Sequence, residues 1–300
     1  MSTDFAPIAG RPLALAPDLA LVLAPNPSPM TYLGTNTYLL GNENLAVIDP
    51  GPDDAAHLQA LVAAIDGRNV SHILLTHSHL DHSPLAAPLA AQTGAPIYAF
   101  GDSNAGRSTV MTQLAQDGLA GGGEGIDRHF KPDVTLSNGQ VLTGDWGEIT
   151  AIHTPGHIGN HLCFAWRDTI FTGDHVMGWA SSLVSPPDGD LTDFMASCAR
   201  LGTYEAAIYY PGHGAPIHDP KGRLAWLVEH RLAREAQILS VLSHQPLDVP
   251  EITAQVYQDL APALRPAAAR NVFAHLVDLH ERGEVTAHPA LSTNASFAKS

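Results

Sequence analysis

The chain has 300 residues, of which 45% are hydrophobic and 15% are charged. That balance permits a buried core of ordinary size and argues against global disorder. The formal net charge of −15 at pH 7 disfavours tight binding of polyanions such as DNA, because an acidic surface repels them. The two cysteines, Cys163 and Cys198, are too few for a disulfide framework.

The N-terminal region lacks the pattern of a targeting or membrane segment. Asp4 precedes any positive charge, and the apolar stretch Leu13–Ala24 is interrupted by Pro17 and Asp18. No stretch reaches the roughly 20 apolar residues that a membrane-spanning helix needs. The expectation is a cytoplasmic protein without membrane contact.

Apolar runs and helical spacing alternate in the first hundred residues. A helix is expected over Ala55–Ile65, after the N-capping pair Asp53-Asp54, and Pro84 suits the first turn of a second helix. The expected strands are Leu19–Leu23, Tyr38–Leu40, Leu45–Asp49, Ile73–Thr76 and Pro96–Phe100. This succession is typical of an α/β arrangement.

The middle of the chain returns to strands after a glycine-rich segment. That segment, Gly118–Gly125, is predicted to be a mobile surface loop. A helix is expected over Leu191–Leu201. The expected strands are Val134–Leu136, Ile149–His153, His161–Trp166, Thr169–Thr172 and Ala207–Tyr210.

After Pro220 the pattern becomes helical. One long helix is expected over Leu224–Leu242, and two shorter ones near Pro250–Leu260 and Pro266–Arg282. A short β-like piece, Glu284–Ala287, follows. The last residues, 291–300, are expected to be a frayed tail.

The densest group of potential metal ligands is the run His77-Ser78-His79-Leu80-Asp81-His82, directly after an expected strand. In an extended segment His77 and His79 point to the same side, because alternate residues share a face. Asp81 and His82 fall where the chain turns toward a helix, so they can address a second point nearby. Neutral imidazole and carboxylate together suit zinc, with iron and manganese as alternatives.

Further ligand-type residues follow later strands, each beside glycine or proline. His157 lies in Thr154-Pro155-Gly156-His157, Asp174 follows Thr172-Gly173, and His213 lies in Pro211-Gly212-His213-Gly214. One such residue means little, but repetition at three strand ends predicts that they converge with the first run on one metal site. The competing interpretation, unrelated loop histidines and N-capping aspartates, does not account for the joint pattern.

These segments together resemble the metallo-β-lactamase superfamily, whose hallmark loop has the form His-x-His-x-Asp-His. The resemblance covers residues 19–220. It implies an α+β fold, a four-layer αβ/βα sandwich of two face-to-face sheets with helices outside and a metal site at one edge. The C-terminal region resembles a small helical, winged-helix-like domain. The expected division is a catalytic domain over residues 1–222 and a winged-helix-like domain over residues 223–300.

The resemblance also implies a role for each ligand. His77, His79 and His157 would hold one metal; Asp81, His82 and His213 would hold a second, and Asp174 would bridge both. Asp49 matches an acidic residue that orients the ligand loop. Two divalent metals about 3.5–4 Å apart can share a water and lower its pKa to about 7. Asp81 is also the predicted catalytic residue, steering the proton of that water.

Two departures from the family pattern bear on function. Ser83-Pro84 stand where Gly-Gly often follows the hallmark loop, which removes no ligand. A bridging Asp174 resembles the glyoxalase II and nuclease branches, so hydrolysis of β-lactams is disfavoured. Within the superfamily, the segments 35–41 and 210–214 look like the beta-lactamase-like protein 2 group, whose best-studied member cleaves single-stranded RNA.

The remaining histidines are expected to serve no metal. His153, His161 and His175 flank the ligand segments and are expected to pack or to orient ligands, since two metals already have a complete set. The others are expected at the surface or at interfaces: His57, His72, His129, His218, His230, His244, His275, His280 and His288.

Three functions remain in competition. The first is a dinuclear zinc-dependent hydrolase of a small ester, thioester or related acyl substrate, which the acidic balance favours. The second is a single-stranded RNA phosphodiesterase, which the kinship favours. The third is a nucleic-acid-binding regulator, which is disfavoured because the ligand set is intact and the helix Pro266–Arg282 carries only Arg270 and Arg282 within its length. RNA and a homodimer stay open as partners.

Overall fold

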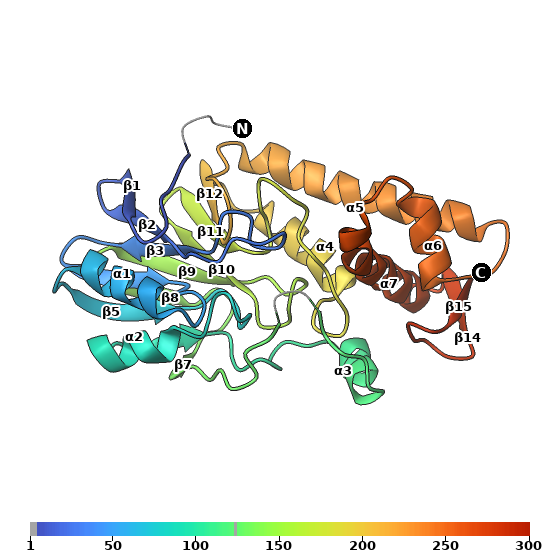
Figure 1. Cartoon of the computed structure of the whole chain (residues 1–300), viewed down its shortest axis with the longest axis horizontal. Helices are drawn as coiled ribbons and strands as arrows, with labels where there is room; N and C mark the ends of the chain where they lie inside the picture. Colours follow the sequence, from blue (N-terminus) through green and yellow to red (C-terminus); the bar gives the residue numbers. More distant parts are fainter. Residues whose placement is uncertain (1–4, 123–124) are drawn as a thin grey trace.

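The computed structural model describes residues 5–122 and 125–300. Figure 1 shows a sandwich of two sheets at one end of the molecule and a mainly helical C-terminal part at the other. The predicted loop Gly118–Gly125 falls in part on residues 123 and 124, which lie outside the described residues. No helix within the described ranges has the length and apolarity needed to cross a bilayer.

The N-terminal sheet contains seven strands in chain order. Pairing is antiparallel from β1 to β4 and parallel from β4 to β7. The strands are β1 (Pro12–Ala16), β2 (Leu19–Leu23), β3 (Asn36–Leu40), β4 (Asn44–Ile48), β5 (Asn69–Leu74), β6 (Ile97–Ala99) and β7 (Val134–Thr135). The unpredicted β1 is an edge strand with no fully buried residue; Leu15 and Ala16 pack partly buried against the core, which leaves only a weak apolar pattern.

The second sheet contains five strands in the order β12-β11-β10-β9-β8. They are β8 (Val141–Gly144), β9 (Gly147–His153), β10 (Leu162–Trp166), β11 (Thr169–Gly173) and β12 (Ile208–Pro211). Four of them overlap predicted strands. The unpredicted β8 is an edge strand whose Val141 is 49% exposed, and it carries one buried residue, Leu142.

Helices cover the outer face of each sheet, which gives the predicted four layers (Figure 1). On the first sheet α1 (Ala55–Ile65) and α2 (Ala86–Thr93) pack through apolar residues such as Leu61 and Leu89. On the second sheet α4 (Leu191–Leu201) and the first part of α5 (Pro220–Leu242) do the same through residues such as Phe194. The α+β sandwich expected from the family resemblance is thus present.

The main core lies between the two sheets. Inward side chains of both sheets form one apolar cluster, in which Trp146, Phe164 and Phe171 are at most 1% exposed. Their alternation with outward residues along each strand is the period of two that strands impose. This packing fixes one sheet against the other and so fixes the loops at the edge where the strands end.

Two local expectations about helices need correction. Pro84 lies two residues before α2, which begins at Ala86, because the chain is still turning there and the Ser83 amide donates to the His79 carbonyl at 3.0 Å. A short helix, α3 (Thr109–Gln116), was not predicted. Ser108 caps the start of α3, because its hydroxyl accepts from the Met111 amide. The apolar residues of α3 pack against the C-terminal part.

The C-terminal part combines two helices with a small three-stranded sheet. The helices are α6 (Val249–Val256) and α7 (Arg265–Glu281), with a 3₁₀ turn at Pro262–Leu264 between them. The sheet has the order β13 (Leu247–Asp248), β15 (Ser296–Lys299) and β14 (Val285–His288). Helices followed by a β-hairpin form the winged-helix arrangement that the resemblance implies.

The prediction of a frayed tail is wrong. Residues 296–299 form β15, which pairs with both β13 and β14, and Phe297 is 0% exposed against Phe273 of α7. A single buried aromatic residue in a polar segment gives too short a pattern to be recognised as a strand, so the tail gains its order from the helices that it covers.

One helix joins the two parts. Leu224 and Leu227 near the start of α5 pack with the sandwich, whereas Ile238 and Leu242 near its end pack in the C-terminal core. The proposed boundary between residues 1–222 and 223–300 therefore falls inside a continuous helix. Because α5 is rigid along its length, it couples the position of the C-terminal part to the sandwich.

We expect Phe297→Ala to destabilise the protein by about 3–5 kcal/mol, because it removes a fully buried ring and leaves a cavity. The exposed neighbour Lys299 provides the matched control, and Lys299→Ala is expected to change stability by less than about 0.5 kcal/mol. Urea denaturation followed by circular dichroism measures both. Equal stability of the two variants would mean that the tail does not contribute to the C-terminal core.

Candidate metal centre

The structure brings together all seven residues that the sequence predicts as ligands. They form two groups, in each of which one donor atom per residue lies within 4.8 Å of the others. The first group is His77, His79 and His157, and the second is Asp81, His82, Asp174 and His213. All seven are buried.

The ends of several strands place these residues at one edge of the sandwich. The run that starts at His77 follows β5, His157 follows β9, Asp174 follows β11, and His213 follows β12. Gly212 permits this crowding, because a Cβ atom there would lie 2.4 Å from Asp174 Oδ1. Gly212 is thus required because the backbone there lies too close to Asp174 for any side chain.

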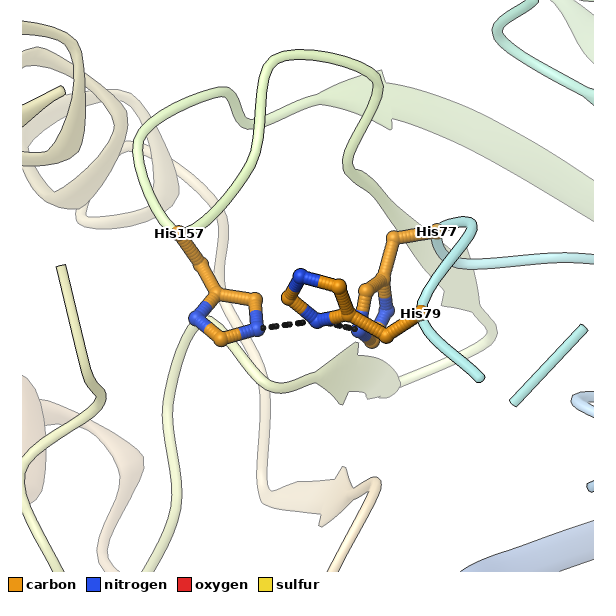
Figure 2. A group of neighbouring side chains, drawn as sticks. All are labelled: His77, His79 and His157. Carbon is orange, nitrogen blue, oxygen red and sulfur yellow. Dashed lines mark hydrogen bonds between the residues drawn. The ribbon is translucent and has the colours of Figure 1, made fainter. Parts of the chain in front are cut away.

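The first group is arranged around His79 (Figure 2). His77 Nε2 and His157 Nε2 each lie 3.0 Å from His79 Nδ1. The outer nitrogen of His157 donates to the Leu183 carbonyl at 2.8 Å, and that of His77 lies 2.9 Å from Thr76 Oγ1. When the outer nitrogens are protonated and the rings are neutral, the inner nitrogen of each ring carries a free lone pair. Lone pairs that converge on one point are the donor set of a cation.

The second group repeats this arrangement. His82 Nδ1 donates to Asp49 Oδ2 at 2.9 Å, and His213 Nδ1 donates to the Gly34 carbonyl at 3.1 Å. Their inner Nε2 atoms lie 3.3 Å apart, and His213 Nε2 lies 3.1 Å from Asp81 Oδ2. The outer acceptors again turn a lone pair of each ring inward.

Two carboxylate oxygens in this group make no hydrogen bond to the described residues. Among the residues that the structure describes, Asp81 Oδ1 and Asp174 Oδ1 are buried without a hydrogen-bond partner. Burying such an atom costs free energy unless something else satisfies it. A divalent cation would do so, and these residues therefore fit a metal site.

Asp174 lies between the two groups. Its Oδ2 atom is 3.3 Å from His213 Nε2 and 3.7 Å from His157 Nε2. The other oxygen is 3.4 Å from His82 Nε2. A carboxylate that faces ligands of both groups has the geometry of a bridge.

Asp49 ties the hallmark loop to the first sheet. It follows β4 with a left-handed φ of 51°, a conformation that costs energy for a non-glycine residue. Its carboxylate accepts from the Thr76 amide at 2.7 Å and the Thr76 hydroxyl at 2.6 Å, besides His82. One side chain thus orients His82 directly and His77 through Thr76.

The pKa values of the first group suit neutral ligands. Burial lowers the pKa of His79 to about 3 and holds that of His77 well below its usual range. Both rings are consequently neutral at pH 7, which is the protonation state that binds a metal.

The second group behaves in the opposite way. Burial alone would lower the pKa of His213, but Asp174 and Asp81 raise it to about 10. The same carboxylates hold the pKa of His82 well above its usual range against the effect of burial. Without a metal, the two protonated rings neutralise the two carboxylates.

A pocket opens onto these groups. Met30, Met177 and Leu183 give it an apolar wall, and Ser185 and Asp188 line the other side. His79, Asp81, His157 and Asp174 reach its lining. A substrate in this pocket would therefore contact both groups and an apolar surface.

The other histidines belong to neither ligand group. None of His153, His161 and His175 joins a ligand group, and His161 Nε2 accepts from the Asp174 amide at 3.3 Å, which agrees with an orienting role. The expectation of a surface or interface position is wrong for His57 and His275, each 1% exposed. His57 lies on α1, and its Nε2 atom is 3.0 Å from Thr37 Oγ1 of β3.

Sequence reasoning missed several residues that shape the site. Thr76 links Asp49 to His77, and the Asn36 amide group donates to the Pro211 and Gly214 carbonyls at 3.0 and 2.9 Å, bracing the loop of His213. Leu183 acts through its backbone carbonyl. A carbonyl leaves no trace in a sequence pattern, whereas the polar segment 35–37, directly before the predicted strand Tyr38–Leu40, was a usable signal.

Comparisons with known families identify both parts of the chain. Residues 30–213 match the metallo-beta-lactamase superfamily, and residues 249–291 match the beta-lactamase associated winged helix domain. The beta-lactamase-like protein 2 homolog of Drosophila melanogaster is 31% identical over 277 residues, which covers 88% of each chain. The atrochrysone carboxyl ACP thioesterase of Aspergillus fumigatus is 32% identical over 239 residues, 77% of this chain and 66% of that protein.

Solved structures share the whole architecture. A metallo-beta-lactamase family protein from Thermus thermophilus aligns with a TM-score of 0.77 at 25% identity, covering 96% of this chain and 100% of that one. A beta-lactamase domain protein from Burkholderia ambifaria aligns with a TM-score of 0.81 at 21% identity, covering 99% and 96%. The second likeness concerns the fold alone.

We expect His79→Ala to lose about one equivalent of bound metal and most of the activity, because His79 Nδ1 is the point where the other two ligands of its group meet. Metal analysis of protein purified without chelator, combined with turnover, measures both. The exposed His129 provides the control, and His129→Ala should keep both metals. Full metal content and activity in His79→Ala would contradict the ligand assignment.

Asp49→Asn is expected to weaken metal binding by about 10–100-fold, the usual effect of removing a hydrogen-bond partner of a ligand. The amide keeps the shape but removes one charged acceptor from His82 or Thr76. Competition with a chromogenic chelator measures the affinity. The exposed Asp53 serves as control, and an Asp53→Asn variant as weakened as Asp49→Asn would point to a general charge effect.

Metal binding is expected to release protons. Since the raised pKa of His213, about 10, keeps its ring protonated at pH 7 in the metal-free site, the metal must displace that proton. The affinity should rise between about pH 6 and 9, by about tenfold per pH unit for each proton released. Calorimetric titration with Zn²⁺ in buffers of different ionisation enthalpy measures the release. Heats that do not depend on the buffer would show that His213 is already neutral.

Proposed function

Because the chain belongs to the metallo-β-lactamase superfamily, whose members are metal-dependent hydrolases, we propose that it hydrolyses a small ester, thioester or related acyl substrate at a two-metal centre. The observation that carries the proposal is the convergence of seven buried donor side chains in two groups, with Asp174 facing ligands of both. We assign His77, His79 and His157 to one metal. Asp81, His82 and His213 bind the other.

Zinc is the metal that we propose for both positions. Three imidazoles in one group, and two imidazoles with carboxylates in the other, are a donor set that zinc binds well. Iron and manganese accept the same donors. When bound, such ions supply Lewis acidity and lower the pKa of a shared water to about 7.

Asp81 is the residue that we propose to handle the proton of the attacking water. Its Oδ2 atom is held by His213, while its Oδ1 atom is buried without a partner among the described residues. Asp81 also lines the pocket, so the carboxylate oxygen that does not hold the metal would lie beside the position of a substrate. That oxygen can accept the proton and later return it to the leaving group.

An acyl substrate is favoured by the pocket and by kinship. Met30, Met177 and Leu183 line one side of the pocket and suit an uncharged organic group better than a phosphodiester. A relative 32% identical to this chain is named as an acyl carrier protein thioesterase. The net charge of −15 also disfavours a polyanionic substrate.

Single-stranded RNA is the second candidate substrate. The observation in its favour is the similarity to beta-lactamase-like protein 2 homologs over 88% of the chain, because that group is the one for which the sequence resemblance implies RNA cleavage. The residues that would hold two metals for the acyl reaction would serve here too, since such ions would supply the Lewis acidity that phosphodiester hydrolysis needs.

A DNA-binding regulator is disfavoured by the C-terminal part. The arginines of a recognition helix must be free to reach DNA, but Arg270 of α7 donates to the Ala120 carbonyl and to Ser185 Oγ, both at 3.1 Å. Arg282 pairs with Asp278 at 2.9 Å. We propose instead that this domain covers the active site and holds its loops.

A panel of substrates tests the proposal directly. S-lactoylglutathione, a lactone, nitrocefin, bis(p-nitrophenyl) phosphate and a short single-stranded RNA should be compared at equal enzyme concentration. We expect turnover of the thioester or lactone that falls by at least about 100-fold in Asp174→Asn, since removal of a charge-stabilising group costs that much. Turnover of the RNA that is abolished in Asp174→Asn, with inert acyl substrates, would replace the acyl proposal by the second candidate.

A further inference from the structure

An apolar groove adjoins the pocket of the metal centre. It has a cavity volume of about 480 Å³, and its lining includes Tyr32, Leu33, Trp179, Pro216 and Ile217. The volume is in the range of sites that take small organic ligands or larger ones. No feature of the reaction described above uses this groove.

Two loops contribute to both the groove and the metal pocket. In the first loop, Met30 lines the metal pocket while Tyr32 lines the groove. In the second, Met177 lines the metal pocket while Trp179 lines the groove. The groove therefore begins where the apolar wall of the metal pocket ends.

Two contacts hold the aromatic pair of the groove, Tyr32 and Trp179, in place. The rings of Tyr32 and Trp179 stack with centroids 5.0 Å apart at 17°. Trp179 also lies against Gly214, where a Cβ atom would approach its ring to 2.8 Å. Because Gly214 follows the ligand His213, the stack is positioned relative to the metal centre.

The loop that carries Tyr32 is closed by hydrogen bonds and contains a residue in a strained backbone conformation. Asn26 accepts from the Thr35 amide at 2.9 Å and donates to the Thr35 hydroxyl at 3.0 Å, which closes the loop. Tyr32 itself has a left-handed φ of 57°. Even so, its side chain is 45% exposed and that of Leu33 is 37% exposed. Strain that displays apolar side chains to solvent beside a site is a mark of function.

We propose that this groove binds the apolar arm of the substrate, an alkyl chain or aromatic ring attached to the scissile ester or thioester. This inference rests on the proposed acyl function. Nucleobases could also stack on Tyr32 and Trp179, but RNA needs free cations for its phosphates. Arg223 lines the groove, yet it donates to the Met177 and Ala180 carbonyls at 2.6 and 2.7 Å.

A chain-length series tests the groove. We would measure kcat/KM for N-acetylcysteamine thioesters from acetyl to octanoyl. A fully buried methylene is worth about 0.8 kcal/mol, or about fourfold, and we expect the octanoyl to acetyl ratio to exceed about tenfold. Tyr32→Asn, which keeps a residue tolerant of positive φ, and Leu33→Ala should each lower this ratio by at least about tenfold.

A matched control keeps the result specific. Leu264 is 40% exposed in the C-terminal part, close to the 37% of Leu33, and lies outside the groove. Leu264→Ala should show the ratio of the unaltered protein. A different result is that all thioesters are hydrolysed but neither Tyr32→Asn nor Leu33→Ala changes the octanoyl to acetyl ratio. That result would overturn the proposed role of the groove and leave the acyl function in place.

A binding measurement separates the groove from the reaction. The octyl thioether of N-acetylcysteamine cannot be hydrolysed, and calorimetry should show that it binds more tightly than the ethyl thioether. If no thioester is hydrolysed but this preference is present and is lost in Tyr32→Asn, the groove is supported and the acyl function fails. Equal binding of both thioethers overturns the groove. The proposal for the groove is also overturned if the octyl thioether does not bind but a single-stranded RNA oligonucleotide does, and if Tyr32→Asn abolishes the binding of that RNA.

Discussion

The structure depends on one electrostatic constraint, the burial of imidazole and carboxylate groups that point toward one another. The outer nitrogens of His157, His82 and His213 each donate to an acceptor. The inner nitrogen of each ring is therefore the one that faces the other ligand-type groups. Two carboxylate oxygens beside them are buried without hydrogen bonds among the described residues. Protons can relieve this in the metal-free chain, and cations held between the groups would relieve it as well. The folded state and the metal-loaded state are therefore linked.

The sandwich explains how distant residues can be held with this accuracy. Each ligand follows a strand whose inward side chains are fixed in the core between the sheets. Asp49 then connects two adjacent parallel strands, β4 and β5, by accepting from Thr76. Ligand positions are consequently set by backbone that is rigid, while the loops beyond them are left to shape the pocket.

The C-terminal domain contributes to the site through one loop. Arg231 of α5 donates to the Ser182 carbonyl and, at 3.1 Å, to Asn271 Oδ1, which also accepts from the Val184 amide at 3.3 Å. The residue between them, Leu183, accepts from His157. A chain of hydrogen bonds thus runs from α5 and α7 to a metal ligand. The C-terminal part therefore supports the segment 182–184, whose Leu183 lines the pocket.

The sequence by itself indicated the candidate ligands, through residue types at strand ends, and most strands of the two large sheets, through the period of apolar side chains; the resemblance of the motifs indicated the family. It also indicated Asp49, as the acid that closes a strand. Tertiary structure alone decided that β1, β8 and β15 exist, that His57 and His275 are buried, and which carbonyls and glycines complete the site. The physical reason is that edge strands and backbone acceptors gain their order from contacts with distant segments, which local pattern does not encode.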